Sequence, residues 1–207
     1  MTLADIAPPV QDPAPTSPSR GRGRQLVVGA SIALLLAAGG IIGATYYYDS
    51  VALPESTVTY QVVSVSALSP QVAQAFVAAV DPGFYESGDS LITQRYAVIA
   101  AGTGEESDLR TRIMARKAES TYTKEEILDR YLNRADFGRG AVGLVAAAQT
   151  YFGKPATQLT LAEAALLAVQ LDPDHPAQPA GWVKILDIMV DHEWLTPAER
   201  SSLTYPG

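Results

Sequence analysis

Cysteine is absent from this sequence, and histidine occurs only twice, at His175 and His192. Without cysteine the chain has no disulfide framework and no thiolate metal site. The two histidines are too far apart along the chain to suggest a histidine-based metal site. We therefore predict no metal and no cofactor. The lack of cysteine does not assign a redox compartment, although it is compatible with an extracytoplasmic location.

Positive charge is also scarce. The 207 residues carry a formal net charge of −7, and residues 49–207 contain 12 Lys or Arg against 20 Asp or Glu, a net charge of −8. A protein that neutralises the phosphates of a nucleic acid needs a basic face. Nucleic acid is therefore not an expected partner. An anionic substrate would need a local basic cluster to overcome the overall negative field.

One long segment has no charge at all. Residues 26–45 are uncharged and mostly apolar, and as a helix they would be about 30 Å long, which matches the core of a bilayer. Arginines precede this segment, whereas tyrosines and an aspartate follow it, namely Arg20, Arg22, Arg24, Tyr46, Tyr47, Tyr48 and Asp49. The arrangement predicts a transmembrane helix over residues 25–48. The protein would cross the cytoplasmic membrane once, with a cytoplasmic N-terminus and an extracytoplasmic C-terminal domain.

Two other interpretations of the apolar segment are a cleaved signal peptide and a buried core helix, but both the run and the tail before it are long for a signal peptide. Residues 1–24 are rich in Pro, Ser, Thr, Ala and Asp without an apolar period, which predicts a disordered cytoplasmic tail. Gly39 and Gly43 form a GxxxG pair. This pair fits either helix self-association or a helix that is simply rich in glycine and alanine, so the oligomeric state stays open.

Residues 49–66 are predicted to link the apolar segment to a domain over residues 67–207. Alternating β-branched residues at 58–68 indicate a strand or an extended linker. Helix signals dominate afterwards, because three capping boxes precede apolar runs: Thr123 with Glu126, Thr160 with Glu163, and Thr196 with Glu199. Their glutamates are therefore interpreted as helix caps rather than catalysts. The glycines of residues 136–143 mark a tight turn between helices, and the domain is predicted to be mainly α.

A long stretch of this domain carries a family resemblance. Residues 124–168 read KEEILDRYLNRADFGRGAVGLVAAAQTYFGKPATQLTLAEAALLA, and residues 182–199 resemble the helix pair that follows. The pattern resembles the peptidoglycan glycosyltransferases of family 51, the transglycosylases found alone or in class A penicillin-binding proteins. The resemblance implies a lysozyme-like fold and polymerisation of lipid II in bacterial cell-wall synthesis. It also implies a glutamate as general base, with cations and a second glutamate at the diphosphate leaving group.

The positions that carry this chemistry depart from the family pattern. In the first motif Asp81 and Phe84 match, but Val80 stands at the glutamate position and Ser87 at the histidine position. The segment that follows in the family is missing. In the second motif Gly88, Ser90, Ile92, Thr93 and Gln94 match, whereas Leu91 and Arg95 replace a threonine and a glutamine, and Val98 replaces a lysine. In the third motif an ungapped alignment places Asp108 at the lysine and Thr111 at the second glutamate.

The resemblance leaves one candidate catalytic carboxylate in the altered motifs, Glu86. The candidate substrate-binding residues are Asp81, Phe84, Ser90, Thr93, Gln94, Arg95, Arg110 and Arg112, and the three arginines are candidates for contacts with the diphosphate. We predict a catalytically degenerate transglycosylase that acts as a binding or scaffold protein. Its expected partners are lipid II or a nascent glycan strand, the bacterial cytoplasmic membrane and cell-wall synthases.

Two alternatives to a binding or scaffold role remain open. The chain could be an active, divergent glycosyltransferase that uses a relocated carboxylate, either Glu86 or Glu119. It could also be a truncated gene product, since no Ser-x-x-Lys or Lys-Thr-Gly transpeptidase motif occurs in it.

Overall fold

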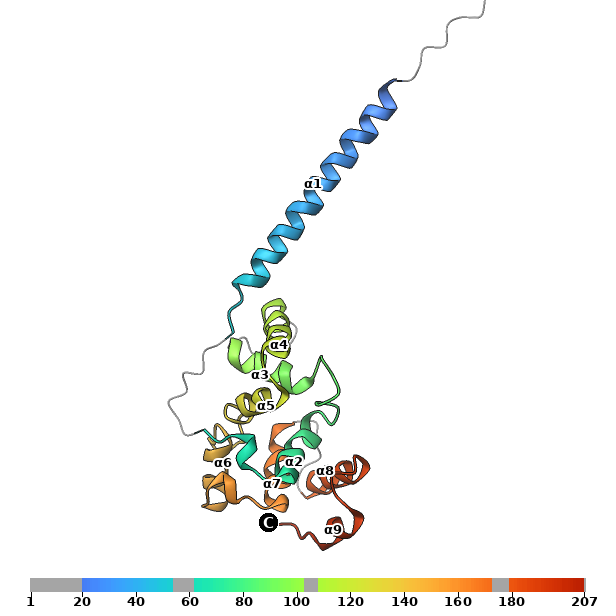
Figure 1. Ribbon diagram of the computed structural model, residues 1–207. Coiled ribbons are helices and arrows are strands. Elements are labelled where there is room, and N and C mark those ends of the chain that lie inside the picture. The colour runs from blue at the N-terminus through green and yellow to red at the C-terminus, as the bar shows by residue number, and fades with distance from the viewer. Residues whose placement is uncertain (1–19, 54–61, 103–107, 173–178, 207) are drawn as a thin grey trace, which may run out of the picture. The chain divides into compact units, whose positions relative to one another are not determined.

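The structure is a computed structural model that describes residues 20–53, 62–102, 108–172 and 179–206. Residues 1–19, which belong to the predicted cytoplasmic tail, lie outside this description. The chain divides into two compact units, residues 1–49 and 50–207. The described residues contain no β-strand, only one isolated bridge between Asp136 and Val142. The prediction of a mainly α chain is confirmed (Figure 1).

The first unit contains helix α1, Arg20–Ser50, whose side chains are described from Leu34 onward. Its large apolar side chains are exposed, with Leu35 at 73% and Ile42 at 69% of their accessible surface. Among the side chains described, no helix combines the length and the apolarity that a bilayer crossing requires.

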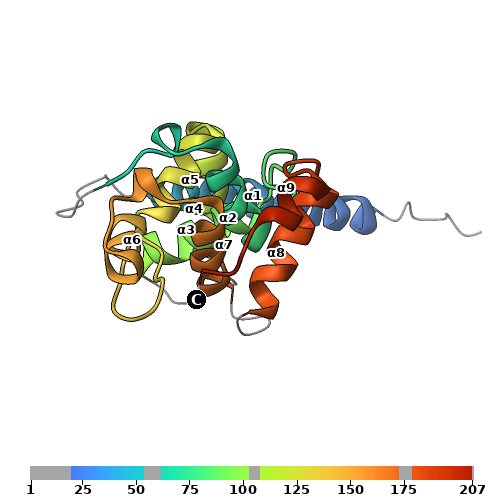
Figure 2. The ribbon, with the colours of Figure 1, turned by 90° about the horizontal axis from the view of Figure 1, so that it is seen from below.

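The second unit is a bundle of short helices. They are α2 (Pro70–Val80), α3 (Leu91–Ala101), α4 (Leu109–Thr121), α5 (Lys124–Leu132), α6 (Leu144–Phe152), α7 (Leu161–Ala168), α8 (Ala180–Asp191) and α9 (Pro197–Ser202). Short 3₁₀ turns occur at Val65–Ala67, Ala156–Gln158 and Val169–Leu171. Two views show α2 and α7 side by side in the middle of this unit (Figures 1 and 2).

Helix α2 forms the centre of the core because apolar residues cover nearly all of its surface. Every residue from Ala75 to Val80 is buried, and α2 packs against α7 and α8. Phe76 meets Phe137 edge to face, with ring centroids 6.1 Å apart. Aromatic pairs in this geometry add stability beyond the area they bury. Since α2 ends at Val80, the core extends to the start of the altered motifs.

The segment before α2 is held against α5 by side chains rather than by a sheet. Of the expected strand or extended linker at 58–68, residues 58–61 lie outside the description, and residues 65–67 form a 3₁₀ turn. The Asn133 amide accepts from Val63 N at 2.9 Å and donates to Val63 O at 2.8 Å. Asp129 accepts from Val65 N and from Ser64 Oγ. The side chains at the end of α5 therefore replace the partner strand that this segment lacks.

All three predicted capping boxes are present, at the starts of α5, α7 and α9. In the second, Glu163 accepts from Thr160 N at 2.8 Å and also lies 2.7 Å from Lys154 Nζ. Partial burial acts to raise the pKa of Glu163, but the hydrogen bonds from Lys154 and Thr160 outweigh it and hold this pKa below its ordinary value. The Glu163 side chain is therefore more stable as a carboxylate in the folded domain.

Glu163→Gln should lower the free energy of unfolding by about 1 kcal/mol at pH 7, because it removes a charge-assisted contact at a partly shielded site. Because the pKa of Glu163 is lowered by folding, its carboxylate stabilises the fold fully above the unfolded-state pKa of about 4.3. This stabilisation is lost as the pH falls through the pKa of Glu163 in the folded state. Urea unfolding curves of wild type and variant should therefore converge at acid pH. Glu125→Gln, at an exposed site on α5, is the control; a difference for Glu163→Gln that stays constant with pH would contradict this account.

The glycines of residues 136–143 form the tight turn that the sequence indicates. Gly138, Gly140 and Gly143 all have positive φ, and so does Arg139. At Gly143 a Cβ atom would lie 2.8 Å from Asn133 O, which is too close for any other residue. The turn therefore presses the start of α6 against the end of α5, beside the amide that holds Val63.

Candidate functional site

The first altered motif and the start of the second form one loop between α2 and α3, residues 81–90, and this loop caps α3. Asp81 Oδ2 accepts from Leu91 N at 2.8 Å, and Ser90 Oγ accepts from Thr93 N at 3.1 Å. Both side chains satisfy amides that the first turn of a helix leaves without partners. Asp81 and Ser90 therefore fix where α3 begins, and the carboxylate of Asp81 is engaged by the backbone.

Phe84 and Lys124 hold the middle of this loop. The Phe84 ring is fully buried, and Lys124 Nζ lies 4.6 Å from its centroid in a cation–π contact. The same Nζ donates to Ser87 O at 2.6 Å. Lys124 is the first residue of α5, so the start of that helix is tied directly to the loop.

Glu119, near the end of α4, joins the loop to α3 and α5. Thr93 Oγ1 donates to Glu119 Oε1, and Lys124 Nζ lies 2.9 Å from Glu119 Oε2. Ser90 Oγ and Thr93 Oγ1 are 2.7 Å apart, so Ser90 donates to Thr93 while Thr93 donates to Glu119. We call Ser90, Thr93, Glu119 and Lys124 the hydroxyl–carboxylate cluster. The Glu119 side chain is only 13% exposed, and its bonds to Thr93 and Lys124 hold it in place.

The two positions to which the resemblance assigns the family's glutamates are both buried. Val80 is 6% exposed and belongs to the main apolar core, and Thr111 on α4 is 1% exposed. Neither side chain can accept a proton as a carboxylate does. The core therefore fills the position where the resemblance implies a general base.

Two further predicted residues, Glu86 in the loop and Gln94 on α3, are at least partly exposed. Glu86 is exposed, and no contact to its carboxylate is found among the described residues. Gln94 Nε2 donates to Asp89 Oδ1 at 2.9 Å. The hydroxyl–carboxylate cluster therefore includes the predicted residues Ser90 and Thr93, but neither Glu86 nor Gln94.

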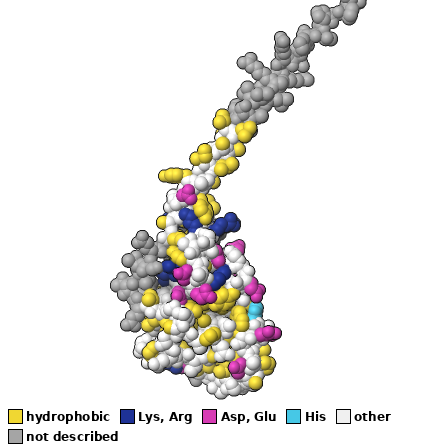
Figure 3. Space-filling view, in the orientation of Figure 1, with side chains coloured by type: hydrophobic (Ala, Val, Ile, Leu, Met, Phe, Trp, Pro, Cys, Tyr) yellow, Lys and Arg dark blue, Asp and Glu magenta, His cyan; other side chains and the backbone are white. Residues whose placement is uncertain are grey.

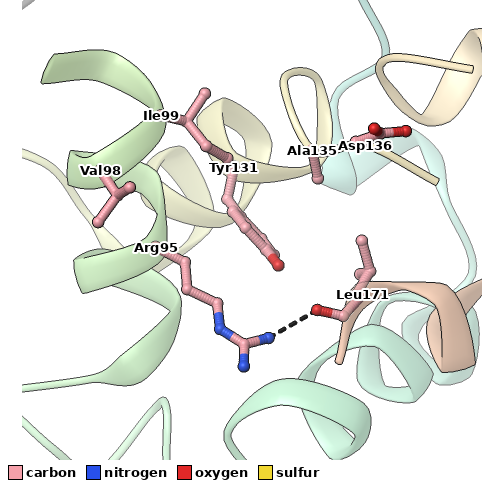
Figure 4. Close-up of a pocket in the computed structure, with 7 residues that line it drawn as sticks. All are labelled: Arg95, Val98, Ile99, Tyr131, Ala135, Asp136 and Leu171. Carbon is pink, nitrogen blue, oxygen red and sulfur yellow. Dashed lines mark hydrogen bonds between the residues drawn. The ribbon is translucent and has the colours of Figure 1, made fainter. Parts of the chain in front are cut away.

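Arg95 is directed away from this cluster. Its guanidinium donates to Leu171 O at 2.6 Å and pairs with Asp172 at 3.0 Å. It lines a cavity of about 200 Å³ together with Tyr131 and five other residues, Val98, Ile99, Ala135, Asp136 and Leu171 (Figure 4). Burial acts to lower the pKa of Arg95, but Asp172 and Tyr131 together outweigh burial and raise this pKa. Burial raises the pKa of the Tyr131 phenol. Arg95 thus joins α3 to the turn after α7.

Arg110 and Arg112 are exposed on the first half of α4. They precede Glu119 by nine and seven residues, so at 1.5 Å per residue they lie about 13 and 10 Å from it along the helix. Neither arginine has a hydrogen-bond or ion-pair partner among the described residues. The structure therefore separates these candidate diphosphate ligands from the hydroxyl–carboxylate cluster.

In the described part of the chain, no three His, Asp or Glu side chains are grouped as a metal site. The chemical groups available around the loop are hydroxyls, one lysine and the carboxylates of Asp81, Glu86, Asp89 and Glu119. They can orient and hydrogen-bond a polar ligand.

Comparison with known proteins places this helical bundle in a family. A family model described as Transglycosylase matches residues 68–181, which is more than half of the chain. The chain therefore belongs to the transglycosylase family, glycosyltransferase family 51, and is a peptidoglycan glycosyltransferase-type domain.

Penicillin-binding proteins are among its curated relatives. Penicillin-binding protein 1A of Mycobacterium tuberculosis is 34% identical over 181 residues, covering 70% of this chain and 22% of that protein. Penicillin-binding protein 1A of Mycolicibacterium smegmatis is 36% identical over 136 residues, covering 58% and 17%. Penicillin-binding protein 1F of Bacillus subtilis is 33% identical over 132 residues, covering 51% and 18%. The chain thus spans about a fifth of the length of these relatives.

Proposed function

We propose that this chain is a membrane-anchored, lysozyme-like transglycosylase domain that has lost glycosyl transfer and binds lipid II or a nascent glycan strand as a scaffold for cell-wall synthases. The observation that carries the proposal is the burial of Val80, 6% exposed within the apolar core, at the position of the family's general base. Loss of a general base alone typically costs about 10²- to 10⁴-fold in rate. The second glutamate position, Thr111, offers no replacement.

The carboxylates nearest to this position support the loss of activity. Asp81 is engaged by the amide of Leu91, and Glu119 is engaged by Thr93 and Lys124. A general base needs a free lone pair within hydrogen-bond reach of the proton it takes. The bonds of Asp81 and Glu119 instead preserve the shape of the loop. A preserved loop without a proton acceptor fits a site that binds a sugar substrate without transferring it.

A membrane anchor is part of the same proposal. Residues 26–45 carry no charge, three arginines precede them, and Asp49 follows. Helix α1 runs through this segment, and its exposed apolar side chains from Leu34 onward need a nonpolar surrounding. An α-helix satisfies its backbone hydrogen bonds internally, as a membrane span must. We place the N-terminus in the cytoplasm and residues 50–207 outside it.

The alternative to a binding role is an active glycosyltransferase with a relocated carboxylate. Glu86 favours it most, because its side chain is exposed in the loop and is not held by a hydrogen bond or ion pair to any described residue. Glu119 favours it less, since its position beside Thr93 depends on an ion pair with Lys124.

Polymerisation and binding assays with lipid II in detergent separate the two proposals. We expect the full chain to bind fluorescent lipid II and to make no glycan strands, both as wild type and as Glu86→Gln or Glu119→Gln. Asp191→Asn, at an exposed site near the end of α8, is the matched control. Strands made by wild type and by this control but lost in either glutamate variant would establish the active alternative, whereas a lack of lipid II binding would refute the binding role.

A further inference from the structure

The surface of α4 is basic although the unit that contains it is acidic. Residues 49–207 carry a net charge of −8, yet α4 alone contributes four of their 12 cationic side chains, Arg110, Arg112, Arg116 and Lys117. Lys and Arg side chains gather near one end of this unit (Figure 3). Such a concentration within an acidic domain indicates a local partner of negative charge.

The helical positions of these residues separate a buried face from a basic face. Thr111, Met114, Ala115 and Ala118 turn inward. The outward arc carries the four cations with Leu109, which is 58% exposed, and Ser120. Of the acidic residues next to this arc, Asp108 is the N-cap of α4 and Glu119 is engaged by Lys124. We call Leu109, Arg110, Arg112, Arg116 and Lys117 the basic face of α4.

Three cations of this face are available for binding. Arg110, Arg112 and Arg116 are all exposed, and none of them has an ion-pair partner among the described residues. A lipid headgroup layer offers phosphates at its outside and apolar groups beneath them. The exposed arginines fit the phosphates, and the exposed Leu109 among them fits the apolar groups.

The residue that directly follows α1 in the chain is bound to α4. Val51, the residue after α1, is 4% exposed and packs with Ala97, Met114 and Ala115. Its carbonyl accepts from Lys117 Nζ at 2.6 Å. The segment that directly follows α1 in the chain is therefore held by α4.

We propose that the basic face of α4 docks on the headgroups of anionic phospholipids in the membrane that holds α1. This inference rests on the anchor proposed above. Docking would hold residues 50–207 flat against the bilayer, where a lipid-linked substrate emerges. Arg110 and Arg112 would then serve the membrane surface rather than the hydroxyl–carboxylate cluster, from which they are separated along α4.

The test uses the full chain in vesicles of phosphatidylcholine, with or without anionic phosphatidylglycerol. The absence of native cysteine allows a single fluorophore to be attached to the Ser120→Cys variant on the outward arc of α4. Quenching by lipids with a nitroxide headgroup then reports contact of α4 with the surface. We expect strong quenching only with phosphatidylglycerol, and its loss in high salt.

Adding Arg112→Gln and Arg116→Gln to the labelled Ser120→Cys variant should weaken docking about 25-fold. The reason is that each cation at an anionic surface raises the affinity by a factor of about five. Adding Arg139→Gln and Lys184→Gln removes the same charge from exposed sites outside α4 and should leave quenching unchanged. Thermal melts check that both double variants fold. Equal quenching in the two lipids, equal effects of the two double variants, or quenching that requires added lipid II would each overturn the proposal.

Flotation with phosphatidylcholine vesicles in high salt reports the anchor separately. A chain that floats but is not quenched in phosphatidylglycerol retains the anchor and refutes α4 docking. A chain that fails to float with phosphatidylcholine, yet is quenched by phosphatidylglycerol vesicles in low salt, refutes the anchor and supports the basic face as a docking surface. If neither signal is found, both proposals fail.

Discussion

Replacing Asn133 by alanine should lower the free energy of unfolding by about 3 kcal/mol. The Asn133 side chain makes three hydrogen bonds, two of them with the backbone of Val63 and one with Asp129 O. Asn133 is 6% and Val63 9% exposed, so water does not readily replace the lost amide. Both polar groups of the Val63 backbone would then be left unsatisfied. The effect should be read from urea unfolding of the full chain in detergent.

Hydrogen exchange gives a second, local measure of the same change. The amide of Val63 should exchange much faster in Asn133→Ala, because the acceptor that protects it is removed. Gln149→Ala, which removes an exposed amide side chain on α6, should change neither measurement. A loss below about 1 kcal/mol in Asn133→Ala, with unchanged exchange at Val63, would show that the segment before α2 is held by its apolar side chains instead.

The helix starts could be predicted because their signals are local. A capping box needs a Thr and a Glu three residues apart, as at Thr160 and Glu163, and the geometry of the first turn then brings both side chains to the free amides. The same reasoning explains the turn at residues 136–143, where glycine permits positive φ. These features depend on neighbours in the sequence, so packing in the folded unit did not alter them.

The hydroxyl–carboxylate cluster could not be predicted in this way. Thr93 and Glu119 are 26 residues apart, and only the packing of α3 against α4 brings them together. No helical period links Glu119 to Lys124 either, because α4 ends between them. Similarly, Arg95 meets Asp172 across 77 residues. A charged side chain that the sequence suggests as a ligand contact, such as Arg95, can therefore form an ion pair within the fold instead. Only the tertiary structure distinguishes ligand binding from such an internal contact.

Val80→Glu, which places a glutamate where the resemblance puts the family's general base, should destabilise the domain by about 3 to 5 kcal/mol at pH 7 and should not give polymerisation. Val80 is 6% exposed and shares its apolar cluster with Phe84 and Ile92. A carboxylate without a partner in such a place costs several kcal/mol, or it stays protonated with a raised pKa. The core has closed over this position, so one substitution cannot recreate a working base there.

The pH dependence of Val80→Glu distinguishes burial from simple overpacking. Burial should raise the pKa of the introduced glutamate in the folded state above its unfolded value of about 4.3. The variant then loses folding stability as the pH rises from about 4.3 through the folded pKa. The deficit against wild type should therefore be larger at neutral than at acid pH. Val80→Gln has nearly the same shape without the charge, so its deficit should not vary with pH. A small, pH-independent deficit in Val80→Glu, together with any glycan product, would mean that residue 80 still opens to a catalytic cleft.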